Sequence, residues 1–356
     1  MRRGRPGRRP DRPGSEGLTL AGTEPVSEPG LDARRSPPRR DASIADLVAA
    51  AREGNPRAVA RLVSLVEDRS PLLRDVMAAL APYSGQAQVI GLTGSPGVGK
   101  STTTSALVAA YRARGRRVGV LAVDPSSPFS GGALLGDRVR MQEHATDPGV
   151  FIRSMASRGH LGGLAWATPQ ALRVLDAAGC EVVLVETVGV GQSEVEVAGA
   201  ADTTVVLLAP GMGDGIQAAK AGILEVGDVF CVNKADRDGA DTTVRELTHM
   251  LALGERVEGA WQPPVLKTVA ARGEGIDALV DALEAHHTWL AHHGGLVRRR
   301  AARAAGEIEA IALDDLRQRI GDLRGGRLLD DLAAEVVAGA LDPYAAADRL
   351  VDSVTA

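Results

Sequence analysis

The segment with the clearest chemistry is a glycine-rich octapeptide, Gly94-Ser95-Pro96-Gly97-Val98-Gly99-Lys100-Ser101, which Thr102 follows. It satisfies the phosphate-binding P-loop pattern, and it lies between an apolar run and a helical pattern, as such a loop requires. The glycines let backbone N–H groups close around phosphate oxygens, Lys100 reaches the β- and γ-phosphates, and the Ser101 hydroxyl can ligate Mg²⁺. The segment predicts a site for a nucleoside triphosphate and magnesium.

A carboxylate emerges at the end of a later predicted strand, in Glu186-Thr187-Val188-Gly189. After a P-loop, a carboxylate in this position is expected to bind Mg²⁺ directly or through water, and the Gly189 N–H could sense a γ-phosphate. Gln192 follows closely. Its amide either orients a water molecule or only contacts a mobile loop, and the sequence leaves both roles open.

The segment Asn233-Lys234-Ala235-Asp236 has the NKxD arrangement and also closes a predicted strand. A carboxylate there can accept paired hydrogen bonds from guanine N1–H and the exocyclic amine, a donor pair that adenine lacks. Downstream of a P-loop, this pattern favours GTP over ATP. The next strand ends in Val269-Ala270-Ala271, where we expect a backbone N–H to contact the guanine O6, although Val269 stands where a serine is common.

Two aspartates follow the second predicted strand, Asp124 directly and Asp137 one loop later. An aspartate before proline is often only a turn residue. Here both lie on the phosphate side of the predicted sheet, so we expect them in the outer shell of the metal ion or beside the attacking water. The predicted metal-binding residues are Ser101, Asp124, Asp137 and Glu186, and the predicted catalytic residues are Lys100, Asp124, Glu186 and Gln192.

Lysine is rare in this chain. Of 41 basic residues only Lys100, Lys220, Lys234 and Lys267 are lysines. A coding bias toward arginine explains the scarcity, but an ammonium and a guanidinium are not interchangeable in a tight site. Lys100 and Lys234 lie in the two motifs and Lys267 leads into the last base-side loop, so the lysines are interpreted as a footprint of the nucleotide site.

The elements that must position these residues alternate along the chain. Apolar runs rich in Val, Ile and Leu alternate with helical segments, as in parallel strands joined by crossover helices. This predicts an α/β fold with a doubly wound, mostly parallel sheet whose ligands bind beyond the carboxyl ends of the strands. The predicted strands are Val89–Thr93, Arg117–Val123, Val150–Ser154, Glu181–Val185, Thr203–Leu208, Val229–Asn233 and Val265–Val269.

Four regions are predicted along the chain. Residues 1–41 are rich in Arg and Pro with few large apolar side chains, which predicts a disordered tail. Residues 42–85 show helical periodicity and form a helical N-terminal unit, and residues 86–295 form the P-loop domain. Residues 296–356 predict a helical arm too thin for a core of its own, which suggests packing on a second copy.

Composition excludes several classes of protein. With 356 residues, a net charge of −4 and two cysteines, Cys180 and Cys231, inside apolar runs, no disulfide framework or CxxC metal site is expected. No apolar stretch approaches the roughly 18 residues of a membrane span, and the N-terminus has no apolar signal region. We expect a cytoplasmic protein without a membrane or nucleic-acid partner.

The ordered motifs resemble those of the methylmalonyl-CoA mutase-associated GTPases of the MeaB/ArgK type, within the SIMIBI class of P-loop proteins. The resemblance covers residues 42 to 289 and rests on GLTGSPGVGKST, VDPSSPFSGGALLGDRVRM, FIRSMASRGHLGG, ETVGVGQSE, PGMGDGIQAAKAGILEVGD and NKAD. The long arginine-rich tail and Val269 depart from the family pattern.

The resemblance implies a cytoplasmic GTPase chaperone that gates adenosylcobalamin loading into an acyl-CoA mutase and protects that mutase; methylmalonyl-CoA mutase is the partner that the family name indicates. It also implies a homodimer through the C-terminal helices. The magnesium and switch positions of the family correspond to Ser101, Asp124, Asp137, Glu186 and Gln192. A third switch corresponds to 210–228, which contains Lys220, and Arg158 is either an arginine finger or part of a switch-loop ion pair.

Three other functions remain open from the sequence. Histidines 286, 287, 292 and 293 surround Trp289, which would suit a metallochaperone-type GTPase that inserts nickel. Older descriptions of the family suggest a kinase of an amino-acid transport protein. A module that binds GTP without hydrolysing it is the third, and Glu186, Asp124 and Asp137 together argue against it.

Overall fold

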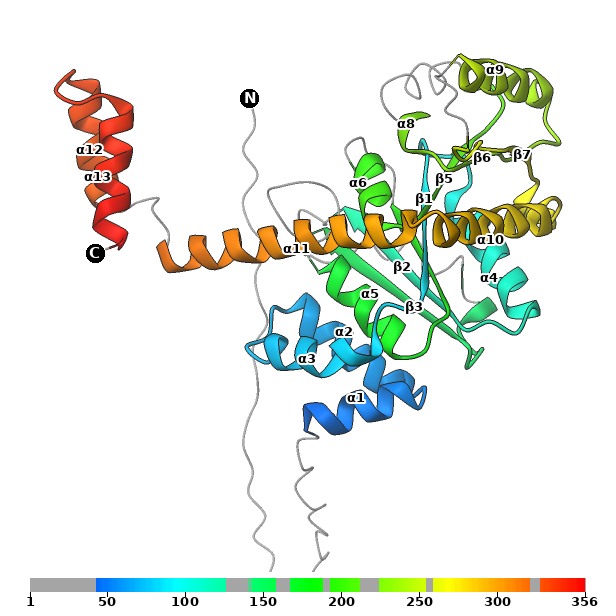
Figure 1. The fold of residues 1–356 in the computed structure, drawn as a ribbon, viewed down its shortest axis with the longest axis horizontal. Coiled ribbons are helices and arrows are strands. Elements are labelled where there is room, and N and C mark those ends of the chain that lie inside the picture. Colours follow the sequence, from blue (N-terminus) through cyan, green and yellow to red (C-terminus); the bar gives the residue numbers. More distant parts are fainter. Residues whose placement is uncertain are drawn as a thin grey trace, which may run out of the picture. The chain divides into compact units, whose positions relative to one another are not determined.

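A seven-stranded parallel sheet forms the centre of the structure, a computed structural model, with strand order β3-β2-β4-β1-β5-β6-β7 (Figure 1). All seven predicted strands are present, so the prediction of a doubly wound α/β fold is confirmed. The strands are β1 (Gln88–Thr93), β2 (Val118–Pro125), β3 (Val150–Ser157), β4 (Val182–Thr187), β5 (Thr203–Leu208), β6 (Val229–Val232) and β7 (Val265–Lys267).

The structure describes residues 43–125, 141, 143–157, 167–187, 193–211, 224–253, 259–320 and 327–355. Ala42–Ala356 form one compact unit. The predicted disordered tail, residues 1–41, lies outside the described residues, and its disorder stays a prediction.

Helices cover both faces of the sheet (Figure 1). α4 (Lys100–Ala113) and α10 (Ile276–His292) pack on one face of the sheet. Their buried apolar residues form a hydrophobic cluster with every second residue of the strands. α5 (Thr168–Ala177) packs on the opposite face, and α9 (Ala240–Ala252) covers β6 and β7 there. Burial on both faces explains why the strands read as continuous apolar runs. α6 (Ser193–Ala200), α8 (Leu224–Val226) and η4 (Ala270–Arg272) complete this region.

The N-terminal helices are α1 (Ile44–Arg52), α2 (Pro56–Glu67) and α3 (Leu73–Leu80), followed by η1 (Ala81–Tyr83). Ser43 begins α1 with a reciprocal capping box, and Asn55 caps α2. Their buried apolar residues belong to the same hydrophobic cluster as residues of β1 to β4 and α5. The helical segment therefore packs into the core of the sheet and does not form a separate one.

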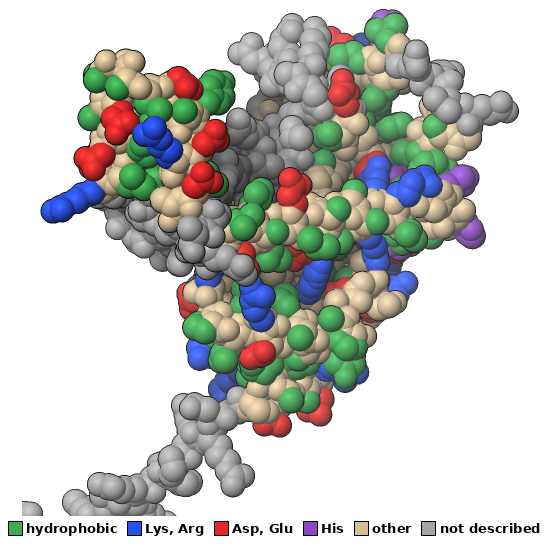
Figure 2. All heavy atoms as spheres, turned by 60° about the vertical axis from the view of Figure 1, so that its left-hand side comes forward, with side chains coloured by type: hydrophobic (Ala, Val, Ile, Leu, Met, Phe, Trp, Pro, Cys, Tyr) green, Lys and Arg blue, Asp and Glu red, His purple; other side chains and the backbone are tan. Residues whose placement is uncertain are grey.

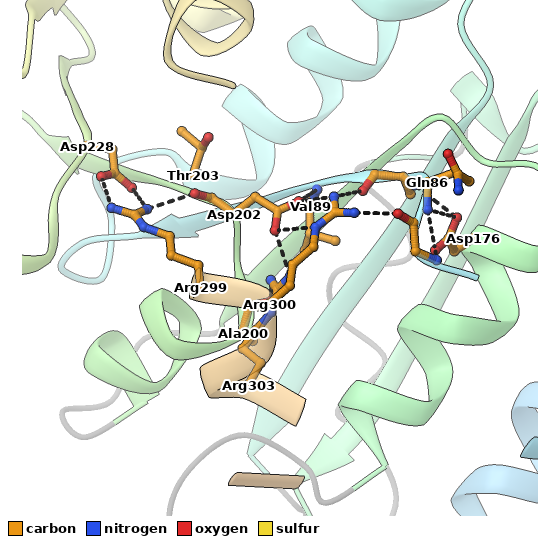
Figure 3. Close-up of polar contacts among 12 residues, drawn as sticks. Gln86, Val89, Asp176, Ala200, Asp202, Thr203, Asp228, Arg299, Arg300 and Arg303 are labelled. Carbon is orange, nitrogen blue, oxygen red and sulfur yellow. Dashed lines mark hydrogen bonds and ion pairs between the residues drawn. The ribbon is translucent and has the colours of Figure 1, made fainter. Parts of the chain in front are cut away.

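The long helix α11 (Gly295–Ile320) is attached to the sheet mainly by charges. Arg299 pairs with Asp228, and Arg300 and Arg303 pair with Asp202, all at 2.6–2.8 Å (Figure 3). Because Asp202 and Asp228 directly precede β5 and β6, these contacts tie the helix to the amino-terminal edge of the sheet. Farther along, α11 forms ion pairs with α5 and the N-terminal helices: Glu307 with Arg173, Asp314 with Arg69 and Asp315 with Arg74.

The remaining helices, α12 (Arg327–Val337) and α13 (Pro343–Thr355), contact each other. Figure 2 shows acidic and hydrophobic side chains together on their surface. Leu328, Val337, Tyr344 and Val351 are exposed there. In the part of the chain that the structure describes, no helix combines the length and the apolar character needed to cross a membrane.

We predict that Asp202→Asn destabilises the protein by about 3 kcal/mol at neutral pH, because it removes the charge partner of two arginines at a fully buried position. The control is Glu335→Gln in the exposed Arg349–Glu335 pair, which we expect to cost less than about 1 kcal/mol. Urea unfolding of both variants measures the difference, and equal effects would contradict the prediction.

The destabilisation caused by Asp202→Asn should depend on pH. Burial by itself would raise the pKa of Asp202, but the hydrogen bond from Arg300 and the charge of Arg303 outweigh it and hold this pKa below its ordinary value. A carboxyl group with a lowered folded pKa stabilises the protein above its unfolded pKa, near 3.9, and loses that contribution as the pH falls through the folded pKa. The destabilisation by Asp202→Asn should therefore shrink only below about pH 4.

Candidate nucleotide site

The P-loop joins the end of β1 to the start of α4, and its glycines adopt backbone conformations that other residues resist. Gly94, Gly97 and Gly99 have φ values of +137°, +81° and +98°. A Cβ atom on Gly94 would collide with the carbonyl oxygen of Leu207 in β5. The loop therefore passes close to the neighbouring strand, and the glycines present its backbone at the carboxyl edge of the sheet.

Lys100, the first residue of α4, folds back over this loop. Its ammonium donates to the carbonyl oxygens of Gly94 at 2.5 Å and Ser95 at 3.3 Å. Lys100 and Ser101 are both buried. Nearby, the fully buried hydroxyl of Thr93 has no hydrogen-bond partner among the described residues. A cationic group and an unsatisfied hydroxyl beside a glycine cradle fit a phosphate ligand.

Glu186 lies at the carboxyl end of β4 with only 1% of its surface exposed. Its Oε2 accepts a hydrogen bond from the Thr104 hydroxyl of α4 at 2.5 Å. This contact brings the predicted metal-binding carboxylate beside the helix that begins with Lys100 and Ser101. The motif analysis missed Thr104, although the run Thr102-Thr103-Thr104 after the P-loop was a signal for it. A buried carboxylate next to a hydroxyl is an oxygen donor set that suits Mg²⁺.

Asn233 connects three parts of the site. Its side-chain Nδ2 donates to the Val98 carbonyl of the P-loop at 2.9 Å. Its Oδ1 accepts from the backbone N–H of Ala270 at 3.0 Å and from the Thr268 hydroxyl at 3.2 Å. Asn233 is nearly fully buried, and it leaves no room for a side chain on Gly99, whose Cβ would lie 2.5 Å from Nδ2. This single amide fixes the P-loop against the loop after β7.

Lys234 and Asp236 follow in the same turn. Lys234 has a left-handed backbone with φ +57°, and its ammonium donates to the Gly97 carbonyl at 2.6 Å. The Asp236 carboxylate is partly exposed and lies 3.7 Å from the guanidinium of Arg272. Arg272 also pairs with Glu274 at 2.8 Å. The NKxD segment thus lies against the P-loop, and Asp236 keeps an accessible carboxylate at its rim.

Two backbone N–H groups in the loop after β7 already form hydrogen bonds within the protein. The Val269 N–H donates to the Glu274 carbonyl and the Ala270 N–H donates to Asn233. The N–H group of Ala271 is not used in these two bonds. Among the three residues predicted to contact the base, Ala271 is therefore the remaining candidate for the hydrogen bond to the guanine O6. Lys267 does not point to this site: its ammonium pairs with Asp241 of α9 at 3.0 Å on the surface. The interpretation of Lys267 as part of a nucleotide footprint was therefore wrong.

Several predicted residues lie wholly or partly outside the described structure. Asp137, Arg158, Gln192 and Lys220 are outside the described residues, as is Gly189. The backbone of Asp124 is placed in β2, which pairs with β4 so that Ala122 lies opposite Glu186. Asp124 is thus two residues beyond the partner of Glu186, at the carboxyl edge of the sheet.

The two cysteines and His286 are buried. Burial raises the pKa of Cys180 to about 12 and that of Cys231 to about 11, so both stay thiols. His286 is fully buried between the Thr203 hydroxyl and Asp228, and burial lowers its pKa to about 4. His293 stacks on Trp289. Within the described ranges, no three His, Cys, Asp or Glu side chains are grouped so that they could hold a metal ion.

The parallel sheet, the strand–loop–helix at Gly94 and the NKxD turn beside it define a P-loop nucleotide-binding protein of the doubly wound α/β class. The family model described as "Methylmalonyl Co-A mutase-associated GTPase MeaB" matches residues 59–323, which is most of the chain. The chain belongs to this family, and the resemblance inferred from the motifs is confirmed.

Relatives and a solved structure agree with this assignment. A Pyrococcus abyssi protein whose name refers to a GTPase is 45% identical over 314 residues, which are 87% of this chain and 97% of the relative. The mouse "Methylmalonic aciduria type A homolog, mitochondrial" is 37% identical over 74% of this chain and 64% of its own length. A crystal structure of an LAO/AO transport system kinase has 28% identity and a TM-score of 0.67, covering 89% of this chain and 99% of that one.

We predict that Asn233→Ala lowers the free energy of unfolding by about 1–3 kcal/mol, because it leaves the Val98 carbonyl and the Ala270 N–H without this partner in a buried place. Lys267→Ala, which removes only an exposed ion pair, is the control and should change stability by less than about 1 kcal/mol. Chemical denaturation measures both. A loss below about 0.5 kcal/mol for Asn233→Ala would show that the amide does not hold the two loops together.

Proposed function

We propose that this protein binds GTP with Mg²⁺ and hydrolyses it. The observation that carries the proposal is the Asn233 amide, which holds the P-loop and the loop after β7 in one arrangement. In this proposal the P-loop N–H groups and Lys100 bind the phosphates, and Lys100 exchanges the Gly94 and Ser95 carbonyls for phosphate oxygens.

The magnesium ion would be held by Ser101 and Glu186, together with Asp124 and Asp137. When bound, Mg²⁺ neutralises charge on the phosphate oxygens. The buried Glu186 carboxylate and the adjoining Thr104 hydroxyl support this assignment. Asp124, Glu186 or Gln192 would position the attacking water. We assign transition-state stabilisation to Lys100 and to the backbone N–H groups of the loop.

Guanine recognition is assigned to Asp236 and to the Ala271 N–H. Asp236 is partly exposed at the rim of the site, 3.7 Å from Arg272, and this accessible carboxylate supports its assignment as the acceptor of the two guanine donors. Lys234 would cover the base or the P-loop, as its bond to the Gly97 carbonyl indicates. A site built on such hydrogen bonds should reject adenine by orders of magnitude.

The biological role we propose is that of a chaperone for a cobalamin-dependent acyl-CoA mutase. The family description and the name of the mouse relative support it. In this role GTP hydrolysis gates the loading of adenosylcobalamin and protects the mutase, and the loops near the γ-phosphate supply the two states. Residues 210–228 with Lys220, and Arg158, are candidates for the coupling. We place this activity in the cytoplasm.

We also propose a homodimer. α11 carries five exposed apolar side chains: Val297, Ile308, Ile311, Leu313 and Leu316. Figure 2 shows hydrophobic side chains along the surface of this helix. Several exposed apolar side chains on one helix are typical of an interface, and a second copy of the C-terminal helices is the occupant we propose.

We predict magnesium-dependent GTP hydrolysis that falls at least about 100-fold in Lys100→Ala, since this ammonium contacts the transferred phosphate group. Asp236→Ala should instead keep hydrolysis but lose discrimination between GTP and other nucleotides. Phosphate release with GTP, ATP and xanthosine triphosphate measures both effects, and Lys267→Ala serves as the control. A preference of the unaltered protein for ATP would refute the guanine assignment.

We predict that a cobalamin-dependent acyl-CoA mutase encoded in the same organism stimulates this GTP hydrolysis and binds the protein in a nucleotide-dependent manner. The assay mixes the purified pair with GTP, GDP or a non-hydrolysable analogue. The kinase alternative, which the name of the solved relative suggests, would instead transfer labelled γ-phosphate to a protein. A metallochaperone would bind about one Ni²⁺ or Zn²⁺ per chain. Either result without mutase binding would contradict the chaperone role.

A further inference from the structure

A second cavity lies at the amino-terminal edge of the sheet, and we call it the strand-start cavity. Its volume is about 650 Å³, and its walls come from the starts of β1 and β4 and from α1, α4 and α10. The residues that matter below are Arg52, Tyr83, Tyr111, Asp176, Glu284 and His287. This volume is in the range of sites for small organic ligands.

The strand-start cavity is separate from the nucleotide site. Gln88, the first residue of β1, lines the cavity, whereas the P-loop begins directly after Thr93, the last residue of that strand. Five steps along a strand span about 16 Å. A ligand in one site therefore does not contact the other, and the proposed GTPase does not account for this cavity.

Two buried polar groups in its wall have no hydrogen-bond partner among the described residues. Tyr111 is 1% exposed, and its hydroxyl has no partner. The Nδ1 atom of His287 is also buried without one. Burial lowers the pKa of His287, so its imidazole is neutral at neutral pH. Unsatisfied buried polar atoms are uncommon in folded proteins, and two in the wall of one cavity point to a ligand that satisfies them.

The carboxylates of the cavity already have partners. Asp176 accepts from the backbone N–H groups of residues 85–87. Glu181 accepts from Arg116, and Glu284 pairs with Arg114 at 3.1 Å. Glu181 and Glu284 are therefore paired with arginines, and the Asp176 oxygens are occupied by backbone hydrogen bonds, so these carboxylates do not call for a cationic ligand.

Arg52 is different. Its guanidinium stacks on the ring of Tyr83, with 3.6 Å between Cζ and the ring centroid, and it has no acidic partner among the described residues. Stacking uses the face of a guanidinium and leaves its edge N–H groups available to an oxyanion. Arg116 also lines the cavity, but it is paired with Glu181. The cavity thus offers Arg52 as a cation without an acidic partner among the described residues, together with the neutral hydrogen-bonding groups of Tyr111 and His287.

The lip of the cavity is held in place from two directions. Asp176 binds the N–H side of residues 85–87, and Arg300 of α11 donates to the carbonyl oxygens of Gly85 and Ala87 (Figure 3). Because both sides of this backbone segment are fixed, the wall beside Gln86 and Gln88 is formed before any ligand binds. Such preorganisation lowers the entropic cost of binding.

We propose that the strand-start cavity binds a small organic or inorganic oxyanion, a carboxylate or a phosphate compound no larger than a mononucleotide, with Arg52 contacting the anion and Tyr111 and His287 contacting the polar body. This inference does not depend on the proposed GTPase function.

The experiment is calorimetric titration with inorganic phosphate and, separately, with succinate, which distinguishes a phosphate ligand from a carboxylate ligand. The protein is first saturated with GDP, and the titrations are repeated with Lys100→Ala, so that phosphate binding at the P-loop is excluded. We expect at least one probe to bind saturably at one site per chain in both proteins.

Three variants test the residues. Arg52→Gln should weaken binding of that probe at least tenfold, and Tyr111→Phe should weaken it at least threefold without lowering the melting temperature, because it removes a hydroxyl that has no partner. Arg61→Gln, an exposed arginine on α2, is the control and should bind like the unaltered protein. GTP hydrolysis should be unchanged in all three.

The proposal is overturned if neither probe binds saturably to the GDP-loaded protein. It is also overturned if Arg52→Gln and Tyr111→Phe bind as tightly as the Arg61→Gln control. Loss of hydrolysis in Lys100→Ala with binding retained would separate this site from the nucleotide site.

Discussion

The arrangement of the nucleotide site depends on one buried amide. Asn233 donates to the P-loop through Val98 and accepts from Ala270 and Thr268 in the loop after β7. These partners come from two segments far from Asn233 in the sequence, and an amide has both the donor and the acceptor that they need. Replacing it with a carboxylate or an apolar side chain would leave at least one buried backbone group unsatisfied. The P-loop and the loop after β7 are therefore held together by the same residue.

The helix α11 is held against the sheet by ion pairs. This helix has few apolar contacts with the sheet, and arginines on it reach the buried Asp202 and Asp228. Apolar packing tolerates small rotations of a helix, whereas paired charges with defined hydrogen bonds specify its rotation. That rotation places Arg300 against the lip of the strand-start cavity. The charges that hold α11 thus also fix the backbone at the lip of the second proposed site.

Much of the fold could be predicted from the sequence because it depends on local patterns. Seven apolar runs predicted seven strands, and the position of Gly94 after such a run predicted a P-loop at the carboxyl edge. The motif residues Glu186 and Asn233 were found for the same reason, since each ends a strand. Thr104 was missed because its contact with Glu186 joins residues 82 positions apart. Lys267 was misread because its place near a motif does not determine where its side chain points.

The sequence by itself determined the class of protein, because the P-loop and the NKxD turn are each short runs of consecutive residues that directly follow an apolar strand. Only the tertiary structure decided which groups meet. The bond from Asn233 to Val98 spans 135 positions, and Arg300 reaches Asp202 across 98. Such contacts follow from strand order, because parallel strands bring distant segments to the same edge of the sheet. The strand-start cavity and its unsatisfied hydroxyl exist only at that level.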